Sequence, residues 1–82
     1  GEGIAADTAR GKRLLEEAAQ AGSGQAWMFL GDMYDKAVGV PENIPMAVSC
    51  YQKAAAKKIP EASQALGRYK KTLFGKWKRK ES

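Results

Sequence analysis

The chain repeats itself at a fixed distance. When the sequence is shifted by 36 positions, similar residues coincide, as when Ala18 falls on Ala54. The coinciding positions are Ala18-Ala19 with Ala54-Ala55, Ala26 with Ala62, Leu30-Gly31 with Leu66-Gly67, and Asp7 with Asn43. A period of this length is typical of helical solenoids, in which each helix pair buries its apolar face against its neighbours. The repeat therefore predicts a stack of helix pairs.

Four helices are predicted from the spacing of apolar residues and from residues that begin or end helices. The expected ranges are about 8–21, 24–36, 44–58 and 60–74, begun by Asp7, Ser23, Asn43 and Pro60. Gly31 lies within the apolar stripe of the second helix, where glycine costs about 1 kcal/mol relative to alanine. We therefore expect Gly31 to permit a close approach between two helices.

The central part of the chain carries a recognisable pattern. It reads Ala26-x3-Leu30-Gly31-x2-Tyr34, then Gly39-Val40, then Ala47-x3-Tyr51-x-Lys53-Ala54-Ala55. This pattern resembles the Sel-one-like repeat (SLR), a family rich in bacterial members and related to the tetratricopeptide repeat (TPR). The sequence departs from the family at Ala37, where a glycine is usual, and at Lys70, where a tyrosine is expected one period after Tyr34.

These features predict one all-α domain, a short right-handed α-solenoid of two antiparallel helix pairs with TPR-like form. Residues 7–22 resemble the second helix of a partial repeat, and residues 24–58 a complete repeat. Residues 60–74 are expected to form a terminal helix, since 60–73 resemble the first helix of a following repeat. Residues 75–82 are expected to form a basic tail.

The residues available for chemistry do not favour an enzyme. The chain has no histidine and one cysteine, Cys50, so a His-based general base and an intrachain disulfide are both absent. Asp32 and Asp35 are spaced to share a helix face, but a solvated helix end is the simpler interpretation. The sequence therefore predicts no catalytic residue, no cofactor and no metal site.

Positive charge is concentrated at the C-terminal end. The net charge is +5, and residues 68–82 hold seven of the fourteen Lys and Arg against one of the nine acids. Aromatic residues alternate with the basic ones, and the segment's candidate binding residues are Lys76, Trp77, Lys78, Arg79 and Lys80. Such a segment could bind an anionic membrane or nucleic acid phosphates, although a merely solvated basic face is the simpler alternative.

The resemblance implies a non-catalytic adaptor that binds a protein or peptide partner. Stacked helix pairs expose a concave surface suited to that purpose, and we expect Trp27, Arg68 and Lys71 to contribute to it. Self-association through the ends of the helix stack is a further alternative. The sequence shows no signal or membrane-spanning segment, which favours the cytoplasm slightly but leaves the compartment open.

Overall fold

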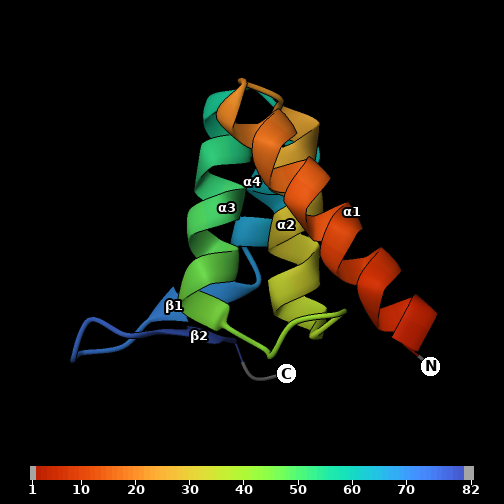
Figure 1. Cartoon of the computed structure of the whole chain (residues 1–82). Helices are drawn as coiled ribbons and strands as arrows, with labels where there is room; N and C mark the ends of the chain where they lie inside the picture. The colour runs from red at the N-terminus through yellow and green to blue at the C-terminus, as the bar shows by residue number, and fades with distance from the viewer. Residues whose placement is uncertain (1, 81–82) are drawn as a thin grey trace.

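The computed structural model describes the backbone of residues 2–80 and the side chains of residues 9–80. Within this range the chain is mostly helical, as predicted, and forms four helices followed by a two-stranded sheet. The elements are α1 (Glu2–Gln20), α2 (Gly24–Lys36), α3 (Ile44–Ala56), α4 (Pro60–Leu66), β1 (Tyr69–Lys71) and β2 (Trp77–Arg79). The helices α2 and α3 form a central antiparallel pair, with α1 packed against α2 and α4 against α3 (Figure 1). None of the described helices is long and apolar enough to cross a bilayer.

The predicted caps define the central helix pair. The Ser23 hydroxyl accepts a hydrogen bond from the Ala26 N–H at 3.1 Å, and Asn43 Oδ1 accepts one from the Met46 N–H at 3.1 Å. The helix α2 has the bounds predicted for it, whereas α3 ends two residues earlier than expected. At the C-terminal end of α2, Ala37 takes a left-handed conformation with φ 56° and ψ 44°. The glycine that the repeat pattern usually has at this position would adopt that conformation without strain.

The first helix extends further than predicted. It begins at Glu2, so the backbone of Asp7 lies inside α1 and the expectation that Asp7 caps the helix is wrong. Both α1 and α2 contribute to a buried cluster that also includes Cys50 of α3. A second buried cluster lies between α3, α4 and β1, with Tyr51 and Tyr69 stacked at a centroid distance of 6.0 Å.

Gly31 lies where α2 and α3 meet, as expected. A Cβ atom added to Gly31 would be only 2.7 Å from Cε1 of the fully buried Tyr51 ring. Because real Cβ atoms do not approach other carbons so closely, any larger residue would have to displace the ring. The glycine therefore allows Tyr51 to pack directly against the backbone of α2.

The prediction of a helix over residues 60–74 and a separate basic tail from residue 75 is wrong. The helix α4 ends at Leu66, and residues 69–79 form a β-hairpin in which Tyr69 lies opposite Arg79. Gly67, a poor helix former, follows the last turn, and Gly75 has φ 79°, which suits a tight hairpin loop. The side chains of Tyr69 and Trp77 share one face of the hairpin and pack against the second buried cluster, which α4 alone does not cover.

Candidate interaction groove

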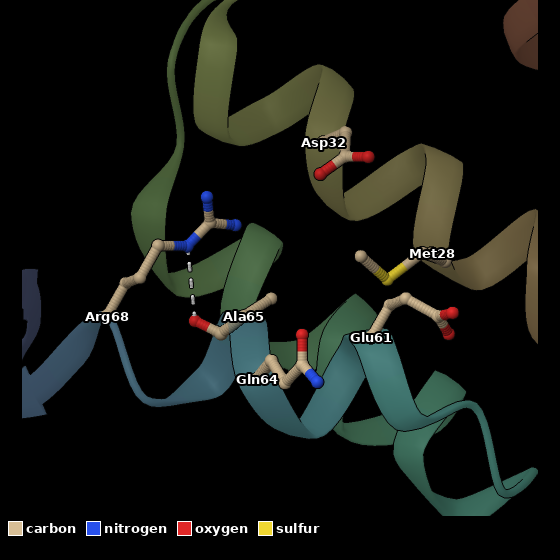
Figure 2. Close-up of a pocket in the computed structure, with 6 residues that line it drawn as sticks. All are labelled: Met28, Asp32, Glu61, Gln64, Ala65 and Arg68. Atoms are coloured by element: carbon tan, nitrogen blue, oxygen red, sulfur yellow. Dashed lines mark hydrogen bonds between the residues drawn. The ribbon is translucent and has the colours of Figure 1, made fainter.

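A groove lies between α2 and the α4 segment. Figure 2 shows Met28 and Asp32 of α2 on one side, Glu61 and Gln64 of α4 on the other, and Arg68 at one end. Its volume is about 320 Å³, and Ala65 completes its lining. The groove thus has acidic, basic and apolar side chains within reach of one bound segment.

The Tyr51 hydroxyl connects Asp32 on one side of this groove with Arg68 at its end through hydrogen bonds. Its hydroxyl donates to Asp32 Oδ1 at 2.5 Å and accepts a hydrogen bond from Arg68 Nη2 at 3.3 Å. Arg68 Nε also donates to the Ala65 carbonyl at 3.5 Å (Figure 2). Burial, together with the hydrogen bond to Asp32, raises the pKa of Tyr51 well above its ordinary value. The hydroxyl therefore stays protonated and holds the carboxylate and the guanidinium in fixed positions.

A second polar network joins the hairpin to the end of α2. Asp35, whose side chain is 8% exposed, accepts hydrogen bonds from the Tyr69 hydroxyl and from Arg79 Nε at 3.0 Å. The Arg79 Nη2 group donates to the Asp35 carbonyl oxygen and to Glu42 Oε2, the latter at 2.8 Å. These contacts fix β1 and β2 against α2 and the loop that follows it.

The charges of this network perturb two pKa values. Burial alone would raise the pKa of Asp35, but the hydrogen bonds from Tyr69 and Arg79 outweigh it, so this pKa lies below its ordinary value. Burial and the hydrogen bond to Asp35 raise the pKa of Tyr69 to about 12. Asp35 is therefore a charged anchor for the hairpin.

The residues predicted from the sequence to bind a partner lie in three different places. Arg68 lines the groove. Trp27 is half-buried beside a smaller cavity of about 100 Å³, where the Lys53 ammonium lies 4.4 Å from its ring centroid. Trp77 packs against the second buried cluster, and Arg79 holds the hairpin in place. Trp27 is thus separate from the groove.

The predicted lysines lie on the hairpin. Lys71, Lys76, Lys78 and Lys80 are exposed, and the Lys71 ammonium lies 5.9 Å from the ring centroid of Trp77. None of these four lysines lines the groove.

Most of the groove residues were not predicted from the sequence. Met28 and Asp32 are four residues apart on α2, so they share one face of that helix. Glu61 and Gln64 are three residues apart on α4, and Arg68, just after the end of α4, is four residues beyond Gln64. That spacing was available as a signal, but nothing in the sequence showed that the two faces oppose each other. Within residues 9–80 no cluster of His, Cys, Asp and Glu is suited to hold a metal ion. Burial raises the pKa of the Cys50 thiol, which disfavours the reactive thiolate.

Comparison with known proteins identifies the family of the helical part of the chain. The searches of curated proteins and of solved structures returned no match. The family model of the Sel1 repeat matches residues 1–23 and 25–58, which include α1, all of α2 except its first residue, and all of α3. This match covers more than half of the sequence and confirms the resemblance to TPR-like helical solenoids. The chain therefore belongs to the Sel1 repeat family.

Proposed function

We propose that this protein is an adaptor that binds a segment of a partner protein in the groove between α2 and α4. Sel1 repeats generally mediate protein–protein interaction and are non-catalytic. The observation that supports a site at this groove is the Tyr51 network, because it holds Asp32 and Arg68 in place before any partner binds. Side chains that are already ordered lose less conformational entropy on binding.

The charges of the groove favour a partner segment that carries both signs. Asp32 and Glu61 lie across from one another and suit a lysine or arginine side chain, while Arg68 suits a carboxylate. Met28 lies between Asp32 and Glu61 and offers an apolar contact there. A short segment that carries a basic, an apolar and an acidic residue would match these side chains, and a volume of about 320 Å³ accommodates only a few side chains.

Selection from a random peptide library on the intact protein tests this proposal. Bound peptides should shift the amide resonances of Met28, Gln64 and Ala65 in nuclear magnetic resonance spectra. The double variant Glu61→Gln, Arg68→Gln should bind the same peptides about tenfold or more weakly, since it removes two charged contacts.

The matched control is Glu17→Gln, Lys36→Gln, which removes one charge of each sign at exposed positions on α1 and α2. The control should bind like the parent. Peptides that shift resonances only in α1 or in the hairpin, or that bind the groove variant as tightly as the parent, would refute the proposed site.

The sequence also favours a second function, in which the basic C-terminal segment binds an anionic membrane or nucleic acid. This function depends on the hairpin and not on the groove. Its strongest support is the composition of the hairpin turn and its two strands.

A further inference from the structure

The turn of the hairpin presents two large apolar side chains to solvent. Leu73 is fully exposed and Phe74 is 91% exposed, whereas Leu14 and Phe29 on the helices are 59% and 53% exposed. In Figure 1 the turn projects beyond the helices at the lower left. The position of these two residues is therefore accessible to a large, flat partner.

The turn is ordered by its own hydrogen bonds. The Thr72 N–H donates to the Lys76 carbonyl at 2.7 Å, and the Gly75 N–H donates to the Thr72 carbonyl at 2.9 Å. This pattern, with Gly75 at positive φ, is a three-residue hairpin loop that contains Leu73 and Phe74. Such loops usually carry polar or small residues, since side chains at their tips face water. The turn does not need a leucine or a phenylalanine in order to form, and their exposure favours a binding role.

Basic side chains surround this apolar tip. The strand register places Lys70 directly opposite Lys78, so both ammonium groups extend from the same face of the hairpin. Like charges at directly opposed positions destabilise a sheet, so this pair is unfavourable unless an anion offsets it. Lys76 borders the turn, and residues 68–80 include no acidic residue. The hairpin is thus complementary to an anionic surface.

We propose that the hairpin of residues 69–79 docks on an anionic lipid membrane. Leu73 and Phe74 enter the boundary between the headgroups and the acyl chains, and Lys70, Lys76 and Lys78 contact anionic headgroups. An apolar tip with a basic surround fits a lipid surface better than a nucleic acid. A nucleic acid would stack on Phe74 and contact the lysines, but it offers no apolar layer for Leu73.

The base of the hairpin supports this role. Tyr69 and Arg79 are fixed to Asp35, so the tip is held at a constant position relative to the helices. Because the hairpin is ordered before it meets the membrane, docking does not require the segment to fold on the surface. The docking surface is also separate from the α2–α4 groove, so the protein could hold a partner segment while bound to lipid.

Sedimentation of the full chain with vesicles tests the inference. Vesicles that contain phosphatidylcholine and phosphatidylserine should bind the protein, and vesicles of phosphatidylcholine alone should bind it much more weakly. The variant Leu73→Ser, Phe74→Ser should lose about tenfold or more of its partition onto anionic vesicles. The variant Lys70→Gln, Lys78→Gln should lose about tenfold or more, and high salt should weaken binding by the parent.

Two controls test whether the loss of vesicle binding is specific to the hairpin or follows from removing any exposed apolar or charged side chain. Phe29→Ser removes an exposed apolar side chain from α2, and Lys36→Gln, Lys57→Gln removes two exposed charges from the helical part. Both should bind vesicles like the parent, and circular dichroism should show that all variants keep the parental helix content.

Three outcomes would overturn the inference. The first is equal binding of the parent and the Leu73→Ser, Phe74→Ser variant to anionic vesicles. The second is binding of a single-stranded oligonucleotide by a parent that ignores vesicles. The third is a dimer, detected by light scattering, that depends on Leu73 and Phe74 while vesicles remain unbound.

Discussion

Replacement of Asp35 by asparagine tests the network that fixes the hairpin. The substitution keeps the size of the side chain but removes the charge that Tyr69 and Arg79 contact. A hydrogen bond to a charged group contributes about 1.5–3 kcal/mol, and the buried Tyr69 contact belongs to this class. The Arg79 side chain is 45% exposed, so solvent screening reduces its contact with Asp35 to about 0.5 kcal/mol. We therefore expect Asp35→Asn to lower the free energy of unfolding by about 2–3.5 kcal/mol at neutral pH.

The pH dependence of this loss provides a stricter check. The pKa of Asp35 in the folded chain lies below its unfolded value, so its charge stabilises the fold above the unfolded pKa. That contribution is lost as the pH falls through the folded pKa, and the difference between parent and variant should shrink below about pH 4.

Urea unfolding followed by far-ultraviolet circular dichroism measures both quantities. Glu17→Gln is the control, because Glu17 is exposed on α1 and should give no difference at any pH. A difference that persists undiminished in acid would show that the loss comes from altered packing and not from the charge of Asp35.

Four further substitutions have defined outcomes. Gly31→Ala should destabilise the protein by about 1–2 kcal/mol, because a Cβ there meets the Tyr51 ring and the clash exceeds the gain in helix propensity; a urea midpoint equal to that of the parent would contradict this. Ala37→Gly should stabilise it by about 0.5–1 kcal/mol by relieving the left-handed conformation, whereas Ala9→Gly within α1 should destabilise it by a similar amount. Thermal unfolding of the two glycine variants should therefore shift in opposite directions. The pKa of Tyr69 is raised from 10.0 to about 12, so its protonated hydroxyl contributes fully to the free energy of unfolding below pH 10, and this contribution is lost as the pH rises toward 12. Between pH 10 and pH 12, the free energy of unfolding of Tyr69→Phe should therefore fall less steeply than that of the parent.

The central helix pair could be predicted because its determinants are local. Ser23 and Asn43 each contact a backbone N–H three residues ahead, so the sequence shows cap and helix together. Gly31 was informative for the opposite reason, since a glycine inside an apolar stripe has no local benefit and indicates a contact with another helix. The structure supplies that contact as Tyr51.

The helix predicted over residues 60–74 was wrong because Tyr69 fits both a helical and a strand pattern. Tyr69 follows Ala62 and Leu66 at helical spacing, and it also begins the strand β1, of which it is the buried residue. Leu73 would have continued the helical stripe, but the structure exposes it fully. Gly67 and Gly75 were the available signals that a hairpin would form instead.

The groove and the Asp35 network could not be obtained from local spacing. Asp35 contacts residues 34 and 44 positions later in the chain, and Tyr51 joins Asp32 to Arg68 across three elements. A pair of aspartates near a helix end is ordinarily solvated, but Asp35 is buried and contacts Tyr69 and Arg79 of the hairpin. The family assignment was confirmed because it rested on the repeat, whereas the individual residues depended on contacts distant in sequence.

The attachment of the hairpin to α2 also affects the cooperativity of unfolding. In an ideal solenoid each unit contacts only its neighbours, so unfolding can proceed one unit at a time. Here Tyr69 and Arg79 reach back to Asp35 and tie the last segment to the central helix pair. The α1 helix packs chiefly against α2. The molecule is therefore asymmetric in its cooperativity, with α2, α3, α4 and the hairpin opening as one unit and α1 able to detach before them.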